Sequence, residues 1–396
     1  MLNIMFSSLT RRLTKQPAVK HKRYLVSTAG LPNLGDEFIT RAWLQYLARY
    51  EPESDIWLDC SNPSHASLLF KDIHPHLHVV NTLWQLVWNT QHLLHDSAAA
   101  AEQMKHWIDD AGTPREDLGI DLLRNVDSIH FLGGGYINQM WKANALLLTA
   151  AYQAKRRNPT LRLYATGLGL YPLEGIDKQL VSEALHIFDH ASVRDKESAE
   201  LTGIERLPDD AFLALADESW KDLEYPGRAF VCLQQDVVGK HPDAIRTITD
   251  SLLKSGISEN EPLTIVEAIP PDDAWSAEQF ENIWPSEVRV LPFTRLWNIG
   301  IPSNPDAVWI SSRFHVHLLA AAAGAKGLAL QFGNDYYNVK HQSLLDIGTG
   351  WDTLHIHDNV ENMPHVATCN AQFTSIAARL SQQKMNEASL LYGSEQ

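Results

Sequence analysis

A short apolar run that ends in a charged turn most constrains how this chain folds. Val308 to Ile310 is apolar on every position, which predicts a buried strand. An alanine-rich segment of high helix propensity follows, and the serine pair that precedes it is expected to cap the helix. The stretch therefore predicts a strand-turn-helix unit. In open α/β sheets such turns bind ligands, because a helix N-terminus presents free N–H groups and a positive dipole end.

This turn carries Arg313 and His315 directly after Ser311 and Ser312. Arginine offers a planar fork of donors to phosphate or carboxylate, and histidine moves a proton near neutral pH. The pair predicts chemistry on an anionic substrate, with the two serines as binding residues. The alternative is that Arg313 pairs with a local acid and His315 is a satisfied interior histidine. Because residues two apart do not share a helix face, Arg313 and His315 reach one ligand only if regular helix begins after Arg313.

Strand-helix units of this kind recur along the 396 residues, which exceed what one core usually supports. They predict two successive α/β domains whose charged strand-end turns face a cleft. The expected parts are a basic tail (residues 1–23), an N-terminal domain (24–217), a linker (218–228), a C-terminal domain (229–380) and a terminal helix or tail (381–396). The expected strands are Tyr24–Thr28, Asp55–Asp59, Leu77–Val80, Ser128–Leu132, Leu161–Ala165, Ala191–Asp195, Ala229–Leu233, Leu263–Ala268, Val288–Leu291, Val308–Ile310 and Gly327–Gln331.

Small and charged residues follow several of these strands. Glycines there permit positive φ and let backbone N–H groups approach a ligand closely. Asp195 is expected to cap the helix Lys196–Thr202, and acids in a first helical turn suit the helix dipole. As functional residues the acids would repel phosphate, so they fit sugar hydroxyls or the role of a base. The candidate binding residues of these turns are Asn33, Gly35, Asp36, Gly134, Gly135, Gly167, Gly169 and Arg194, and the loop 332–340 adds Tyr336 and Lys340.

Composition excludes several classes of function. A net charge of −15 argues against nucleic acid as the main partner, because phosphate backbones need a basic surface. The three cysteines, Cys60, Cys232 and Cys369, are far apart, which fits neither a zinc site nor a disulfide framework. We expect a cytoplasmic protein with no metal and no membrane span. Peripheral contact with anionic lipid is an alternative role for the basic cluster Arg11, Arg12, Lys15, Lys20, Lys22 and Arg23.

The order of the motifs resembles the polysaccharide pyruvyl transferases over roughly residues 24 to 345. The motifs are Asn33…Gly35-Asp36, Gly133-Gly134-Gly135, Gly167-x-Gly169-x-x-Pro172, Ser192-Val193-Arg194-Asp195-x-x-Ser198, Asp209-Asp210-Ala211-Phe212, Ser311-Ser312-Arg313-Phe314-His315 and Tyr336…Lys340. The sequence departs from the family at Asp210 and at Lys326, where proline is common. The resemblance implies an α/β fold of two Rossmann-like domains facing a cleft, similar to the GT-B glycosyltransferases, with the acceptor on the N-terminal and the donor on the C-terminal domain.

The resemblance also implies an activity, the transfer of a pyruvyl group from phosphoenolpyruvate to a sugar as a ketal. Arg194 and Arg313 would each grip an anionic group of the donor, and Lys340 would add charge toward its phosphate. His315 is the expected acid that protonates the methylene carbon, because neighbouring anions favour its protonated form. Asp36 is the candidate base or positions the acceptor hydroxyl. Phosphoenolpyruvate is then a donor substrate, and no cofactor is implied.

Two other functions fit the same residues. One is a GT-B-type glycosyltransferase that uses a nucleotide sugar, and the other is a non-catalytic protein that binds a sugar or a nucleotide. Fold does not fix function, so the acceptor stays open among lipid-linked, nucleotide-linked and polymeric sugars. The Trp- and His-rich segment 83–95 and the loop 332–340 are the expected acceptor-reading segments.

Overall fold

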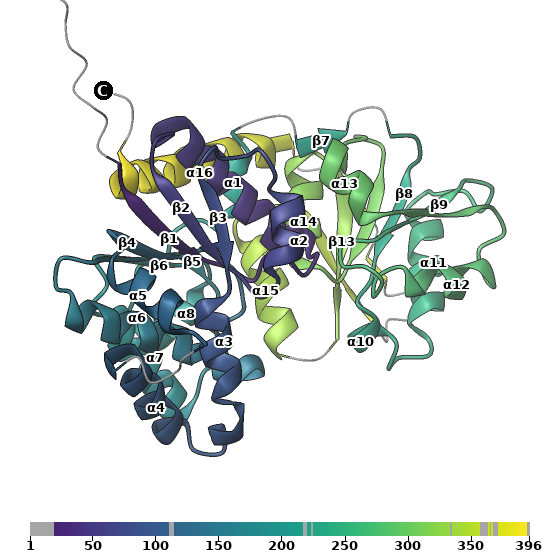
Figure 1. Cartoon of the computed structure of the whole chain (residues 1–396). Helices are drawn as coiled ribbons and strands as arrows, with labels where there is room; N and C mark the ends of the chain where they lie inside the picture. Colours follow the sequence, from purple (N-terminus) through teal and green to yellow (C-terminus); the bar gives the residue numbers. More distant parts are fainter. Residues whose placement is uncertain are drawn as a thin grey trace, which may run out of the picture.

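The computed structural model places the chain in two domains, each built on a parallel six-stranded sheet (Figure 1). It describes residues 20–110, 115–216, 220–222, 225–332, 335–356, 363–364, 366 and 371–393. Of the basic cluster near the N-terminus, Arg11, Arg12 and Lys15 lie outside the described residues. The two sheets with their helices confirm the predicted α/β fold class.

The N-terminal sheet has the strand order β3-β2-β1-β4-β5-β6 with every pair parallel. Crossover helices between successive strands bury the sheet, so β4 is buried at every position. The strands are β1 (Lys22–Val26), β2 (Asp55–Asp59), β3 (Leu77–Val80), β4 (Ser128–Phe131), β5 (Arg162–Leu168) and β6 (His190–Val193). The helices are α1 (Leu34–Tyr50), α2 (Pro63–Leu69), α3 (Thr82–Asn89), η1 (Gln91–Leu93), α4 (Ser97–Asp110), α5 (Asp117–Arg124), η2 (Gln139–Asn144), α6 (Ala145–Arg157), α7 (Gly175–Leu185), α8 (Lys196–Thr202) and α9 (Ala211–Ala214).

The C-terminal sheet repeats this topology in the order β10-β9-β8-β12-β13-β14. Its strands are β8 (Ala229–Cys232), β9 (Leu263–Val266), β10 (Val288–Leu291), β12 (Val308–Ser311), β13 (Lys326–Gln331) and β14 (Asp352–His355). The helices are α10 (Gln235–Val238), α11 (Ala244–Lys254), α12 (Trp275–Glu281), α13 (Phe293–Ile299), α14 (Phe314–Ala322), α15 (Asp335–Asp346) and α16 (Ala371–Tyr392). A separate two-stranded sheet pairs β7 (Lys221–Asp222), within the predicted linker, with β11 (Ile301–Pro302).

Each six-stranded sheet reverses its strand order once, and the reversal determines where a ligand fits. The N-terminal sheet reverses between β1 and β4, and the C-terminal sheet reverses between β8 and β12. In open α/β sheets, ligands bind outside the carboxyl ends of the strands at such a reversal. The turns that the sequence singles out after β1, β4 and β12 therefore lie at the two topological switch points.

The structure confirms several local predictions and overturns others. The strand Asp55–Asp59 has the predicted bounds, and Asp195 caps α8 by accepting from the Ser198 N–H at 2.7 Å. The predicted serine cap of α14 is wrong, because Arg313 occupies the cap position and no side chain caps the helix. The segment expected as a loop up to Lys340 is helical from position 335 onward. Among the described helices, none has both the length and the apolar character needed to cross a bilayer.

The two domains are joined by direct contacts as well as by the chain. The N–H of Leu34, at the start of α1, donates to the Ala268 carbonyl of the C-terminal domain at 2.9 Å. The Arg41 guanidinium donates to the Trp297 carbonyl at 3.0 Å and lies over the Trp297 ring. Helix α16, yellow in Figure 1, returns from the C-terminal domain and packs against α9. These contacts hold α1 against the C-terminal domain.

Helix α16 carries a fully buried cation into the N-terminal domain. The Lys384 ammonium lies 2.8 Å from the Asp210 carboxylate and is also paired with Glu387. Burial alone would lower the pKa of Lys384, but the two carboxylates outweigh it and hold the pKa above its ordinary value. Asp210 also accepts from the Trp43 indole, the Thr166 hydroxyl and the Gly133 N–H. The buried carboxylate of Asp210 thus has a lysine partner from α16.

Replacing Lys384 with methionine is expected to lower the free energy of unfolding by about 3–5 kcal/mol, because it leaves buried carboxylates without their cation. Urea denaturation measures this loss. Arg379→Met is the matched control, since Arg379 is exposed on the same helix and its replacement is expected to change stability by at most ~0.5 kcal/mol. Equal stability of the two variants would contradict the assignment of Lys384 as the partner of Asp210.

Candidate active site

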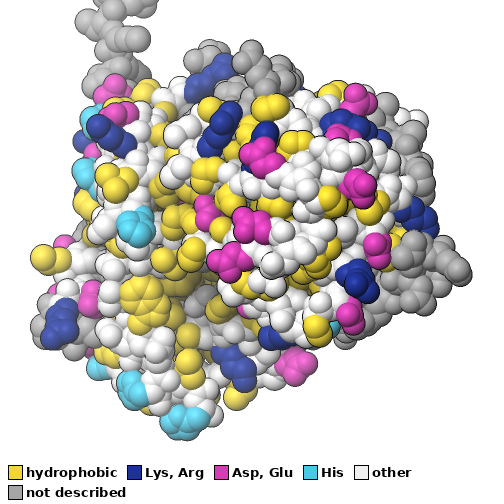
Figure 2. Space-filling view, turned by 90° about the vertical axis from the view of Figure 1, so that its right-hand side faces the viewer, with side chains coloured by type: hydrophobic (Ala, Val, Ile, Leu, Met, Phe, Trp, Pro, Cys, Tyr) yellow, Lys and Arg dark blue, Asp and Glu magenta, His cyan; other side chains and the backbone are white. Residues whose placement is uncertain are grey.

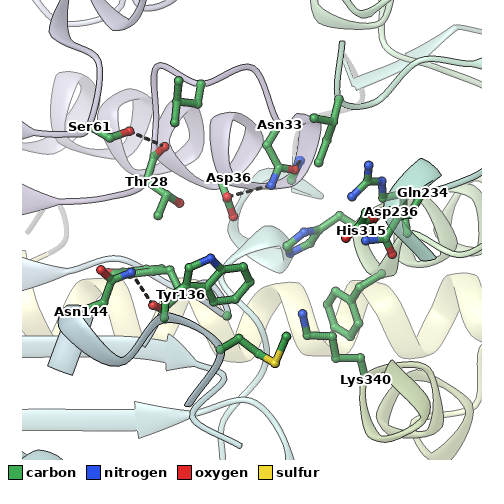
Figure 3. Close-up of a pocket in the computed structure, with 18 of the residues that line it drawn as sticks. Thr28, Asn33, Asp36, Ser61, Tyr136, Asn144, Gln234, Asp236, His315 and Lys340 are labelled. Atoms are coloured by element: carbon green, nitrogen blue, oxygen red, sulfur yellow. Dashed lines mark hydrogen bonds between the residues drawn. The ribbon is translucent and has the colours of Figure 1, made fainter. Parts of the chain in front are cut away.

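A cleft of about 930 Å³ lies between the two domains and is lined from both (Figure 3). The N-terminal domain contributes the turns after β1 and β4, and the C-terminal domain contributes the turns after β8 and β12. The cleft therefore occupies both topological switch points. The predicted site residues that line it are Asn33, Gly35, Asp36, Gly135, Arg194, Ser312, Arg313, His315 and Lys340.

The start of α14 brings Arg313 and His315 to the cleft together. Arg313 has extended backbone angles, φ −96° and ψ 124°, and regular helix begins only at Phe314. This is the condition under which the two side chains reach one ligand. The His315 ring packs against Gly35 so closely that a Cβ on Gly35 would lie 1.8 Å from the imidazole Nδ1. Glycine at position 35 is therefore required for His315 to occupy this place.

Asp209 connects the functional groups of the two domains. Its carboxylate accepts from Arg194 Nη1 at 2.8 Å, and His315 Nε2 lies 3.5 Å from it across the domain boundary. Burial alone would raise the pKa of Asp209, but the charges of His315 and Arg194 outweigh it and hold the pKa well below its usual range. The Ala211 N–H also donates to this carboxylate at 2.8 Å. Asp209 is therefore an anchored anion that holds Arg194 and lies close to His315.

Two cations meet beside Gly135, at the end of β4. A Cβ on Gly135 would lie 3.1 Å from Arg194 Nη2 and 3.4 Å from Lys340 Nζ. The Arg194 guanidinium stacks on the Phe314 ring, with 4.3 Å between the guanidinium carbon and the ring centre. Gly169 leaves room for it, because a Cβ at position 169 would lie 2.8 Å from Arg194 Nε. Burial, together with the nearby Arg194, lowers the pKa of Lys340 to about 7. This part of the cleft favours a bound anion.

The start of α1 places a carboxylate on the same cleft. Asn33 caps the helix by accepting from the Gly35 N–H at 3.3 Å, and its amide donates to the Asp36 carboxylate at 2.9 Å (Figure 3). The cap explains why the helix begins at this point, because Asn satisfies one of the free N–H groups of the first turn. Asp36 is thereby fixed in the cleft as an acceptor for a hydroxyl or a proton.

Arg313 lines the cleft, but it is held by carboxylates of its own domain. Its Nε donates to Asp273 at 3.0 Å, and its Nη2 donates to Asp272 at 2.7 Å. Asp273 is fully buried and also accepts from the Ala268 and Ile269 N–H groups. Arg313 is therefore paired with acids, which is the alternative that the sequence left open for this residue. A role for Arg313 as a direct ligand of an anion stays a prediction.

The remaining predicted residues have different surroundings. Both serines are buried: the Ser312 hydroxyl, which lines the cleft, accepts from the Gln234 N–H at 2.9 Å, and the Ser311 hydroxyl accepts from the Arg313 N–H at 3.0 Å. Gly167 leaves room for Asp210, since a Cβ would lie 2.7 Å from its Oδ1. Gly134, Gly167 and Gly169 are thus behind the cleft wall rather than on it. The Tyr336 side chain lies outside the described residues.

Sequence reasoning did not assign Asp209, Asp272 and Asp273 to the site. Each belongs to a pair of adjacent aspartates: Asp209-Asp210 directly precedes α9, and Asp272-Asp273 follows β9. The signal that could have indicated these three acids is the pairing of aspartates in a chain whose strand ends carry arginines. Their partners could not be read from the sequence, because Asp273 is 40 residues from Arg313.

Gly35→Ala is expected to lower the free energy of unfolding by about 1–3 kcal/mol, because the new methyl group overlaps the His315 ring. Without this overlap, alanine would stabilise the helix relative to glycine by up to ~1 kcal/mol. The sign of the change in the free energy of unfolding therefore distinguishes the two effects. In a His315→Ala background the same substitution is expected to be neutral or stabilising, and urea denaturation of the four proteins of the cycle measures the difference. A destabilisation that persists without His315 would show that the ring does not pack against Gly35.

Comparison with known proteins gives a family match and a set of structural neighbours. The family model for polysaccharide pyruvyl transferase matches residues 33–266. No curated protein sequence matches the chain at a significant level. The matched residues 33–266 include the start of α1, the turns after β4 and β6, and the Asp209 carboxylate described above.

The neighbours are solved structures of two-domain enzymes. A protein from Listeria monocytogenes assigned as a UDP-N-acetylglucosamine 2-epimerase is 16% identical with a TM-score of 0.52, and the match covers 95% of this chain and 93% of that one. The UDP-GlcNAc 2-epimerase of Neisseria meningitidis bound to UDP-GlcNAc is 8% identical with a TM-score of 0.51, with the same coverage of 95% and 93%. These similarities confirm the GT-B-type arrangement of two Rossmann-like domains that face a cleft.

Proposed function

Because the chain belongs to the polysaccharide pyruvyl transferase family, we propose that it transfers a pyruvyl group from phosphoenolpyruvate to a sugar of a cell-surface polysaccharide or its precursor. One observation carries the choice of donor. Arg194 and Lys340 meet beside Gly135, and the Asp209 carboxylate positions Arg194 and His315 at the same place. Two cations next to a proton donor suit a small molecule with two anionic groups and a carbon to be protonated.

The donor fits this part of the cleft by its charges. Phosphoenolpyruvate has a carboxylate and a phosphate, and Arg194 offers a planar fork of donors while Lys340 offers a point charge. Helix α14 adds first-turn N–H groups, since no side chain caps its start and its first residues line the cleft. In this arrangement Arg313 supports the loop after β12 through Asp272 and Asp273 and gives the cleft little net positive charge.

The chemistry follows from these positions. His315 gives a proton to the methylene carbon, and the adjoining carbon that bears the phosphate becomes electron-poor. A sugar hydroxyl attacks this carbon and loses its proton to a base, for which Asp36 is the candidate in the cleft. A second hydroxyl of the same sugar then displaces inorganic phosphate, and its proton leaves with the phosphate or with solvent. The products are a cyclic pyruvate ketal and phosphate, and no cofactor takes part.

Isothermal titration is expected to show that phosphoenolpyruvate binds the wild-type protein and that Arg194→Met weakens this binding about tenfold or more, because one charge-assisted anchor is lost. Arg379→Met, on the exposed face of α16, is the matched control and is expected to bind as the wild type does.

The same titration with UDP-GlcNAc separates the proposal from the nucleotide-sugar alternative. Binding of UDP-GlcNAc without any binding of phosphoenolpyruvate would reject the pyruvyl transferase assignment and favour a glycosyltransferase. Release of inorganic phosphate from phosphoenolpyruvate that requires a saccharide would establish the transfer itself.

The affinity for phosphoenolpyruvate is expected to fall as the pH rises from 7 to 9, by at most about tenfold per unit. Lys340 has a pKa of about 7 in the free protein, so it loses its proton over this range. A bound anion favours the charged form, and binding above pH 7 therefore takes up a proton. The phosphate group of the donor is already fully ionised there and adds little to the slope.

Titrations at pH 7, 8 and 9 measure this dependence. Lys340→Met removes the titrating group and is expected to give weak binding with little slope, whereas Lys340→Arg stays charged and is expected to bind with little slope. A methionine variant that keeps the full wild-type slope would rule out Lys340 as its source.

A further inference from the structure

One wall of the cleft is apolar and aromatic, and the proposed donor chemistry does not use it. This wall, called the aromatic wall below, consists of Trp84, Trp88, Tyr136 and Trp141. Trp88 is 37% exposed and Trp141 is 49% exposed, although large aromatic side chains are usually covered in a folded protein. Leu31 and Met140, which are 57% and 54% exposed, line the same cleft. Figure 2 shows hydrophobic side chains gathered around a hollow on one face of the molecule.

The aromatic wall is held in place by contacts beneath it. The Trp84 indole donates to the Ser27 carbonyl at 3.0 Å, which fixes this ring at the end of β1. Trp84 contacts Trp88 and Tyr136, with ring centres 6.5 Å and 6.1 Å apart. Helices α3 and η2, which carry Trp88 and Trp141, lie against each other. The exposed rings therefore belong to a preformed surface rather than to a flexible loop.

Polar groups line the same cleft as these rings. Thr28, Gln91, Lys142 and Asn144 all line the cleft. The Thr28 hydroxyl oxygen is buried and has no hydrogen-bond partner among the described residues. Asn144 is oriented by its amide, which donates to the Tyr136 carbonyl at 2.8 Å (Figure 3). A ligand here is offered flat apolar faces and hydrogen-bonding groups side by side.

The cleft is larger than the proposed donor needs. Figure 3 shows Tyr136 and Asn144 on the opposite side of the cleft from His315 and Gln234. The volume of about 930 Å³ is near the upper end of the roughly 300–1,000 Å³ typical of small-molecule sites, far more than a three-carbon phosphate fills. The sugar that reacts must lie beside His315. The aromatic wall therefore remains for a further part of the acceptor.

We propose that the aromatic wall binds a pyranose ring adjoining the sugar that receives the pyruvyl group, so that the acceptor is a saccharide of at least two rings. This rests on the proposed function. A pyranose presents an apolar face of C–H groups to an aromatic ring and hydroxyls around its edge, which matches Trp88 and Trp141 beside Thr28 and Asn144. A hydrocarbon chain would cover these polar groups without giving them partners, at a cost in free energy.

The test compares saccharides of one and two rings by isothermal titration in the presence of phosphoenolpyruvate. The probes are the methyl glycosides of maltose, lactose and chitobiose, each beside the methyl glycosides of its component monosaccharides. At least one disaccharide is expected to bind about tenfold or more tightly than its monosaccharides. Trp88→Ala and Trp141→Ala are expected to remove that gain and to leave the affinity for phosphoenolpyruvate within twofold of wild type. Leu118→Ala, 89% exposed and away from the cleft, is the control and is expected to change neither.

The outcomes separate this proposal from the function on which it rests. A panel in which no disaccharide binds more tightly than its monosaccharides overturns the aromatic wall as a saccharide subsite. An n-octyl maltoside, kept below its micelle concentration, that binds tenfold more tightly than methyl maltoside and loses this gain in Trp141→Ala also overturns it, in favour of an alkyl carrier. Failure of phosphoenolpyruvate to bind the wild type rejects the proposed donor, whereas the saccharide titration without donor still reports on the aromatic wall.

Discussion

The candidate site depends on the contacts of the Asp209 carboxylate with Arg194 and His315. The carboxylate is buried in the N-terminal domain, where it holds Arg194, and it faces His315 from the C-terminal domain. Neither domain contains the complete candidate site, because Arg194 of one domain and His315 of the other, the proposed proton donor, both lie at this carboxylate. Domain contacts such as the hydrogen bond from Leu34 to Ala268 therefore affect chemistry as well as stability. A small change in the domain angle would separate His315 from Arg194 before it disturbed either core.

Absent side chains matter as much as present ones around this carboxylate. Gly35 gives space to the His315 ring, Gly169 gives space to Arg194, and Gly167 gives space to Asp210. Glycines in strand-to-helix turns are commonly explained by the approach of a ligand to the backbone. Here Gly35 in α1, Gly167 in β5 and Gly169 just after β5 are explained by the approach of the protein's own side chains, and Gly135 borders the anion-favouring part of the cleft itself.

Local patterns allowed much of the fold to be predicted, because strands, caps and turns depend on near neighbours in the sequence. The strand at Val308–Ile310 and the Asp195 cap follow from such patterns, whereas the serine cap predicted for α14 is wrong because Arg313 occupies that position. Contacts between distant segments could not be predicted in the same way. Asp273 pairs with Arg313 across 40 residues, and the terminal helix or tail predicted over 381–396 is a helix that begins at Ala371. The candidate catalytic residues stay predictions, and the sequence did not indicate the carboxylates that contact Arg194, His315 and Arg313.

The buried lysine of α16 gives the chain an order of assembly. Asp210 accepts hydrogen bonds from three elements of the N-terminal domain, yet its cation is 174 residues further along the chain. During synthesis the N-terminal sheet is complete long before Lys384 exists, and until then the carboxylate has no ammonium to balance it. An uncompensated charge of this kind opposes tight packing. The packing of the N-terminal domain around Asp210 is therefore complete only with α16 in place.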